Sequence, residues 1–284
     1  MITMCMGFGC NAAGVVGTRI IESPRERIIA SVTNSFVPCN GRYPFLIAIS
    51  SIFIAESFTG VTASFASTLV VISVIILGII LTLLISKILS KTILKGVPSS
   101  FILELPSFRK PQIGNIIVRS IFDRTLFVLS RALQVALPAG FVIWFLANTG
   151  INGTSILNNI ASFLNPFAKI IGLDGYILTA FILGMPANEI VLPIILMCYL
   201  GGTSLTDFSD YSIIGEILKA NHWTILTAIN VMIFTVLHFP CTTTLFSIKK
   251  ETGSIKWTIF GFCLPTVCGF LICICTTSLY KIFA

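Results

Sequence analysis

Long stretches without any Asp, Glu, Lys or Arg alternate with short polar segments along this chain. The charge-free runs cover 57–86, 132–168, 220–248 and 257–280. A membrane-spanning helix needs about 20 apolar residues, so each run can hold at least one span. The pattern predicts an all-α polytopic membrane protein with about six to eight membrane segments.

Proline and glycine interrupt the apolar segments at four places. Two breaks are Pro-Cys steps, Pro38-Cys39 and Pro240-Cys241, and two are the glycine-containing segments 7–11 and 184–189. Proline removes a backbone donor, and in lipid such breaks persist only where protein or a watery cavity satisfies the freed groups. Interrupted segments in corresponding positions of two halves indicate a transport site near the membrane midplane. We therefore expect two related gate halves that contain broken or re-entrant helices.

Composition and charge support a membrane location and suggest a topology. Hydrophobic residues make up 55% of the chain, charged residues 10%, and the mean hydropathy is +0.99, whereas soluble domains carry about 25% charged residues. The net charge of +7 then reports topology rather than nucleic-acid binding, because basic residues mark cytoplasmic loops. Basic residues are dense in 87–131. We divide the chain into a partial first gate region (1–86), a cytoplasmic basic connector with an interfacial helix (87–131), and a span with the second gate region and C-terminal helix (132–284).

One carboxylate and three cysteines stand out as candidate metal ligands. Glu189 lies deep in an apolar run, where a charged side chain costs about 2.5–3.5 kcal/mol, and Asn188 precedes it. Cys10, Cys39 and Cys241 each adjoin a break. Thiolate, imidazole and carboxylate together suit ferrous iron or another first-row divalent ion. The sequence therefore favours a metal path.

Each candidate also has a structural explanation. Cysteine fits beside a proline because it is small, and the other six cysteines lie in apolar surroundings, where free cysteine behaves as a small hydrophobe. Glu189 could instead pair with a helix end or a basic residue. His238 is three residues before Cys241 and could add an imidazole ligand, although a histidine near a kink is more often a packing residue. Arg42 is expected to bind local carbonyl groups or to snorkel.

No pattern in the sequence supports an enzyme. The chain contains no phosphate-binding GxxxxGK[ST] loop, no GxGxxG after a predicted strand, no nucleophile elbow and no HExxH helix. We expect neither catalytic residues nor a permanently bound cofactor.

Several motifs together resemble the ferrous iron transport protein B (FeoB) family, in order and over essentially the whole chain. They are Gly7-Phe8-Gly9-Cys10-Asn11, Gly17-Thr18-Arg19, Pro38-Cys39-Asn40-Gly41-Arg42, Leu103-Glu104-Leu105-Pro106-Ser107, Ala187-Asn188-Glu189-Ile190-Val191, and Phe239-Pro240-Cys241 followed by 249–257. Two positions depart from the family pattern: Asn188 replaces a usual lysine, and His238 stands where an aromatic residue is common.

The resemblance implies uptake of Fe²⁺ across the bacterial cytoplasmic membrane by a multi-pass protein, with regulation by a GTP-binding domain. This chain begins within the first gate, so we expect a separately encoded GTP-binding and upstream membrane half as partner. A homo-oligomer is also possible. The predicted metal path uses Glu189, Cys241, Cys39, Cys10, Asn11 and Asn188. Alternatives are a non-transporting membrane fragment or subunit that needs a partner chain, and a transporter of Mn²⁺ or of a small organic solute.

Overall fold

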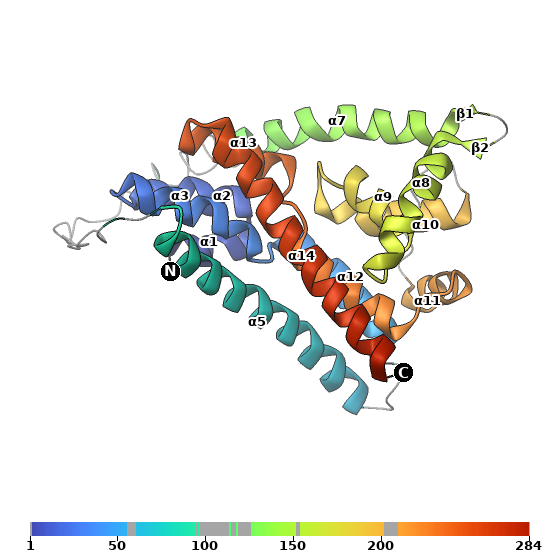
Figure 1. The fold of residues 1–284 in the computed structure, drawn as a ribbon. Helices are drawn as coiled ribbons and strands as arrows, with labels where there is room; N and C mark the ends of the chain where they lie inside the picture. The colour runs from blue at the N-terminus through green and yellow to red at the C-terminus, as the bar shows by residue number, and fades with distance from the viewer. Residues whose placement is uncertain are drawn as a thin grey trace.

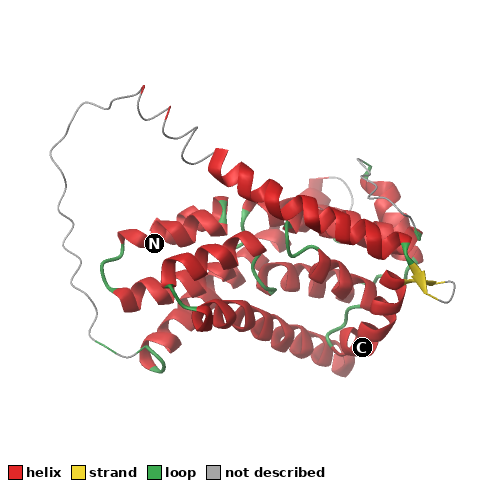
Figure 2. Cartoon of the chain, turned by 90° about the horizontal axis from the view of Figure 1, so that it is seen from above, coloured by secondary structure: helices red, strands yellow, loops and turns green. Residues whose placement is uncertain are grey.

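The computed structural model describes residues 2–55, 61–94, 96, 114, 118, 126–151, 154–201 and 210–283. Nearly all of these residues are helical, and Figure 2 shows the short ladder of β1 and β2 as the yellow strands of the described part. The elements are α1 (Ile2–Gly9), α2 (Asn11–Gly17), η1 (Thr18–Ile20), α3 (Pro24–Thr33), η2 (Asn34–Phe36), η3 (Asn40–Arg42), α4 (Tyr43–Phe53), α5 (Val61–Lys91), α7 (Phe127–Asn148), β1 (Gly150–Ile151), β2 (Thr154–Ser155), α8 (Ile156–Ile170), α9 (Gly175–Leu183), η6 (Asn188–Ile190), α10 (Val191–Leu200), α11 (Tyr211–Ala220), α12 (Ile225–Leu237), α13 (Thr242–Thr252) and α14 (Ile255–Phe283).

Three helical stretches in the described residues are long and apolar enough to cross a membrane. They are Thr62–Lys91, Ile225–Thr252 and Ile255–Ile282. The first and the last are the long diagonal helices α5 and α14 of Figure 1, and the middle stretch consists of α12 and α13. The helices α8 and α9 pass the same test as a pair, although they are bent by 110°. The architecture is therefore all-α and polytopic, as predicted. The predicted six to eight membrane segments would include broken segments, whose separate helices are each too short to count as a full membrane span.

The predicted breaks are present at all four positions. Cys10, Cys39 and Cys241 are the extended residues that immediately precede α2, η3 and α13. Ala187 occupies the same place before η6, after α9 has ended at Leu183. The break at 238–241 lies halfway along the Ile225–Thr252 span. The proline and glycine signals therefore located the interruptions correctly.

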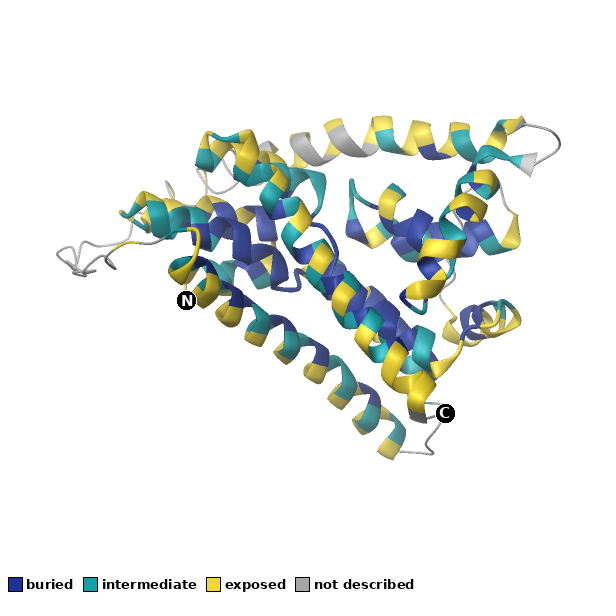
Figure 3. Ribbon diagram, viewed as in Figure 1, coloured by how far each residue is buried: buried dark blue, intermediate teal, exposed yellow. Residues whose placement is uncertain are grey.

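The buried core surrounds α12, and the outer helices expose apolar side chains. Almost every residue of α12 from Ala228 to Leu237 is buried, and Figure 3 shows dark blue along this helix and yellow along the outer side of α5. Phe65, Leu69, Ile72, Ile76 and Ile80 of α5 are all exposed. An apolar stripe of this length suits contact with lipid rather than water.

The charge-free run 132–168, which was predicted to hold at least one span, folds into two helices. Its first part belongs to α7, a helix of 22 residues, and Leu137–Asn148 is an apolar stretch of this helix. Its second part forms most of α8, and the sharp bend between α8 and α9 produces a re-entrant shape or a broken span. Most of the predicted connector and interfacial helix in 87–131 lies outside the described residues. The proposed domain limits therefore stay a prediction.

Candidate functional site

The two halves meet at their 3₁₀ turns, η3 and η6, which contact each other. Cys39 leads into η3, and Glu189 lies within η6. A Cβ atom added to Gly41 would lie 3.2 Å from Oε1 of Glu189, so the absence of a side chain at Gly41 leaves room for this carboxylate. The Glu189 side chain is otherwise exposed on this chain. The fold thus brings one residue from the N-terminal half of the chain and one from the C-terminal half to one junction.

Asn188 connects the first half to the second Pro-Cys step. Its Nδ2 lies 3.9 Å from Sγ of Cys39, and its Oδ1 lies 3.3 Å from Nε2 of His238. The other imidazole nitrogen, Nδ1, lies 2.8 Å from the Thr235 carbonyl oxygen. Carbonyl oxygens only accept, so Nδ1 carries a proton in either the neutral or the charged imidazole. Sequence reasoning had not predicted the Cys39–Asn188–His238 chain of contacts.

The neutral form of His238 sets a requirement for the Asn188 amide. When only Nδ1 is protonated, Nε2 is an acceptor that faces the acceptor Oδ1. The pair becomes complementary if the imidazole gains a second proton or if the amide turns over, so that its NH₂ group donates to Nε2. The turned amide would place Oδ1 opposite the thiol of Cys39, which could then donate to it. The orientation of Asn188 therefore depends on protons held by His238 and Cys39.

Arg42 binds backbone carbonyls from both halves of the protein. The side chain is fully buried. Its Nη1 donates to Val236 O at 2.7 Å and Ser35 O at 3.4 Å, and its Nη2 donates to Phe239 O at 3.4 Å. The C-terminal carbonyls of a helix carry partial negative charge, so a cation beside the end of α12 is favourable. The expected binding to carbonyls is confirmed, and full burial excludes snorkelling.

The two other candidate cysteines lie within electrostatic range of the same region. Cys39 and Cys241 are both close enough to interact electrostatically with Arg42, and Cys241 interacts in the same way with Cys39 and Cys10. Cys241 is half-buried, with Sγ 3.2 Å from Oγ1 of Thr244, whereas Cys10 is exposed. The three cysteines at breaks therefore share one neighbourhood without forming a closed cluster. Within the described ranges, no group of three or more His, Cys, Asp or Glu side chains is positioned to hold a metal ion.

Asn11 and Asn34 form a second polar group beside the first break. The carbonyl of Asn11 accepts from Nδ2 of Asn34 at 2.9 Å. Both side chains are buried, and Oδ1 of each has no partner among the described residues, nor does Oγ of Ser35. The metal-path role predicted for Asn11 stays a prediction. The sequence analysis missed Asn34, although the polar pair Asn34-Ser35 shortly before Pro38 was a usable signal.

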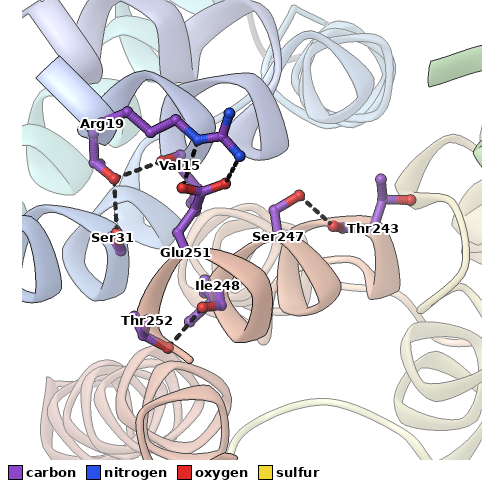
Figure 4. Close-up of polar contacts among 9 residues, drawn as sticks. Val15, Arg19, Ser31, Thr243, Ser247, Ile248, Glu251 and Thr252 are labelled. Atoms are coloured by element: carbon purple, nitrogen blue, oxygen red, sulfur yellow. Dashed lines mark hydrogen bonds and ion pairs between the residues drawn. The ribbon is translucent and has the colours of Figure 1, made fainter. Parts of the chain in front are cut away.

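An ion pair connects the two halves at one end of the molecule. Figure 4 shows Arg19 of η1 beside Glu251 of α13, with two hydrogen bonds of 2.7 Å from Nε and Nη2 to the carboxylate. The Glu251 side chain is only 5% exposed, whereas that of Arg19 is 56% exposed. Nearby, Oγ1 of Thr18 lies 3.1 Å from Oγ of Ser31 and donates to the Val15 carbonyl oxygen at 2.6 Å. The Gly17-Thr18-Arg19 motif therefore contacts the segment that carries the C-terminal motif.

Comparisons with known proteins decide the family. Residues 71–123 match the model of the ferrous iron transport protein B C terminus, and residues 129–255 match the model described as nucleoside recognition. A Staphylococcus aureus protein named Fe(2+) transporter FeoB is 31% identical over 95% of this chain. The chain belongs to the FeoB family. The resemblance inferred from the sequence motifs is confirmed.

Other FeoB relatives match over the same extent. Proteins with the same name from Leptospira interrogans and Methanocaldococcus jannaschii are 24% and 27% identical, over 100% and 96% of this chain. The chain spans only 39% to 43% of the length of these relatives. No solved structure matches it. The match to FeoB therefore covers the part of the family that carries the membrane-spanning helices and the helix breaks described above.

Proposed function

We propose that this chain forms the permease part of a system that carries Fe²⁺ across the bacterial cytoplasmic membrane. All three relatives described above are named Fe(2+) transporter FeoB. The membrane-spanning helices and the broken segments agree with a transport role.

The single observation that carries the proposal is the contact chain from Cys39 through Asn188 to His238. It joins three of the helix breaks, and the His238 break lies halfway along its span. A thiol, an imidazole and the nearby Glu189 carboxylate are ligand types that first-row divalent ions accept. We infer that Cys10, Asn11, Cys39, Asn188, Glu189 and Cys241 line the route of the metal.

An incomplete ligand set suits a conducting path. Binding must favour entry and still permit release, so several weak sites serve permeation better than one closed cage. The described side chains form no closed metal cluster. We infer that Fe²⁺ is held in transit by a few side chains together with water and freed backbone carbonyls.

We further propose that GTP acts on the system through a domain outside this sequence. The matched relatives are more than twice as long as the matched region, and the sequence has no phosphate-binding loop. A GTP-binding domain, on the same polypeptide or on a partner chain with upstream membrane helices, would supply the regulation.

Metal uptake into membrane vesicles from cells that produce the chain with its natural partners tests the function. Vesicles should accumulate Fe²⁺ faster than matched vesicles that lack the chain, and Mn²⁺ and Zn²⁺ should compete poorly. Glu189→Gln should lower the Fe²⁺ rate about tenfold, which equals about 1.4 kcal/mol in the barrier. Glu216→Gln, which alters an exposed carboxylate on α11, is the matched control.

The thiols provide a second comparison in the same assay. Cys39→Ser and Cys241→Ser should slow Fe²⁺ uptake, whereas Cys268→Ser on α14 should not. If the vesicles accumulated Mn²⁺ in preference to Fe²⁺, the transported ion would be Mn²⁺ and the proposal of an iron permease would be wrong. Equal rates with and without the chain would support the non-transporting alternative and refute the proposal.

A further inference from the structure

Helix α14 lines an apolar cavity. The cavity has a volume of about 530 Å³, and almost all of its lining side chains are apolar. Phe262, Thr266, Phe270 and Ile274 contribute to it at intervals of four residues, so they lie along one face of α14. Residues of α8, including Leu164 and Phe167, form the opposite wall. The result is a groove along α14 from Phe262 to Ile274.

The same face of α14 continues into a polar cavity. Thr277 and Lys281 lie one and two turns beyond Ile274, and they line a second cavity of about 590 Å³. Lys169 of α8 lines it too, together with Asn221 and His222. Ile171 and Gly172, neighbours in the chain, line one cavity each. The two cavities are therefore adjacent, one apolar and one polar.

The polar cavity carries positive charge. Asp174 is the single carboxylate among its lining residues, and it already accepts hydrogen bonds from the Tyr199 hydroxyl and from Ile177 N. Neither Lys169 nor Lys281 forms an ion pair with an acidic side chain of the described residues. Two ammonium groups thus face a space large enough for a phosphate-containing group.

The polar cavity lies at the end of α14 that faces away from the cytoplasm. Lys249, Lys250 and Lys256 lie around the start of α14, and Arg25 binds Ser90 near the end of α5. Helix α3, which carries Arg25, packs against α5, α13 and α14, so these basic residues share one end. Basic clusters of this kind face the cytoplasm. Lys281, at the other end of the long helix, belongs to the outer surface of the membrane.

We propose that these two cavities bind one anionic phospholipid of the outer leaflet. The phosphate would lie between Lys169 and Lys281, and an acyl chain would occupy the groove beside Phe270. The positive charge of the polar cavity favours a phosphate there. The adjacent apolar groove lies nearer the middle of α14, and therefore at the depth of the membrane where lipid acyl chains lie. Trp223 and Tyr176 line the polar cavity, and such aromatic residues are common at the level of lipid headgroups. The proposal does not depend on the identity of the transported cargo.

Thermal unfolding of the whole purified protein in mild detergent tests the proposal. Phosphatidylglycerol should raise the midpoint saturably, whereas phosphatidylcholine and inorganic phosphate should not. The double variant Lys169→Ala/Lys281→Ala should bind phosphatidylglycerol about tenfold more weakly, because each lysine contributes to attraction of an anionic lipid. Lys249→Ala/Lys256→Ala, at the cytoplasmic end, should retain wild-type affinity.

A variant of the groove and native mass spectrometry complete the test. Thr266→Trp, which fills the apolar cavity, should weaken the retention of a single bound lipid, and unfolding curves without lipid show whether each variant is folded. Equal stabilisation by inorganic phosphate would indicate a free-anion site and overturn the proposal. So would equal stabilisation by phosphatidylcholine, or unchanged phosphatidylglycerol binding by the folded lysine variant.

Discussion

The two broken regions differ in how completely their buried polar groups are paired. In the second half, Thr242 N donates to the Met185 carbonyl oxygen at 3.0 Å, and Asn188 contacts both Cys39 and His238. In the first half, the buried oxygens Asn11 Oδ1, Asn34 Oδ1 and Ser35 Oγ have no partner among the described residues, and neither does Nε of Arg42. All the unpaired buried side-chain atoms in the described chain thus lie between residues 11 and 42.

This difference suggests different tasks for the two halves. An unpaired buried polar group costs about 1–3 kcal/mol, so water, an ion or a partner group is expected to bind such oxygens. The small residues Gly7 and Gly14 place Asn34 in close contact with α1 and α2, because a Cβ on either would lie under 3 Å from its amide. We infer that the packed helices of the second half, outside its breaks, are a rigid support, and that the first half presents adaptable oxygen groups to the proposed path.

Replacement of Arg42, whose charged side chain connects the two halves, should have the largest effect on stability. Arg42→Met deletes charge-assisted hydrogen bonds to carbonyls of η2 and of the α12 end, and it should lower the free energy of unfolding by about 3 kcal/mol. Thermal unfolding followed by tryptophan fluorescence measures the change. Arg27→Met is the control, because Arg27 bonds only the Ile21 carbonyl within the first half. A loss for Arg42→Met no larger than that of the control would refute the role of Arg42 as a connector.

Two buried asparagines provide a direct comparison of paired and unpaired amides. Asn230 on α12 donates to Ile171 O at 3.0 Å and to Thr277 Oγ1 at 2.9 Å, and its Oδ1 accepts from Thr276. Asn230→Ala should therefore cost about 2 kcal/mol of stability. Asn34→Ala should cost about 1 kcal/mol or less, because only one of its polar atoms is paired.

The two variants should affect transport in the opposite order to their effects on stability. Asn34→Ala should slow Fe²⁺ uptake more than Asn230→Ala does, once the rates are corrected for the amount of folded protein. Uptake and unfolding measured on the same preparations decide this point. If Asn230→Ala proved to be the more damaging variant for uptake, the division into support and adaptable path would be wrong.

A smaller effect is expected where the halves touch. Gly41→Ala would bring a methyl group to 3.2 Å from Oε1 of Glu189, and the carboxylate must move by a few tenths of an ångström. We expect a change in uptake of about threefold, equal to about 0.7 kcal/mol in the barrier. Gly140→Ala is the control, because its Cβ would meet nothing within 4 Å. Identical uptake by both variants would show that the position of Glu189 is not critical.

The smallest effect is expected at the ion pair between Arg19 and Glu251. Arg19→Gln removes this pair, and because the Arg19 side chain is 56% exposed, solvent screens its charge and the expected loss is about 1 kcal/mol or less. Unfolding midpoints should fall slightly at low salt, and the difference from wild type should shrink at high salt because salt screens exposed charges. A loss comparable to that of Arg42→Met would mean that this pair, and not the buried arginine, joins the halves.

Local signals predicted several elements of the site, and the same signals could not predict its contacts. Pro38, Pro240 and Pro186 act on their own backbone, so each break was visible in the sequence. The contact of Asn188 with Cys39 joins residues 149 positions apart, and no local pattern encodes such a pairing. His238 was weighed as a ligand from its distance to Cys241, and the structure shows that its Nε2 faces Asn188 instead.

The sequence by itself determined that the chain is an all-α membrane protein of the FeoB family, where its helices break, and which side chains stand at the breaks. Hydropathy and proline act over a few residues, so these properties follow from local composition. Only the tertiary structure decided that η3 meets η6 and that Arg42 reaches carbonyls of both halves. It likewise decided that the first half keeps unpaired buried oxygens. These outcomes depend on how helices that are distant in the sequence pack together. Local sequence patterns do not specify which distant residue a side chain will contact.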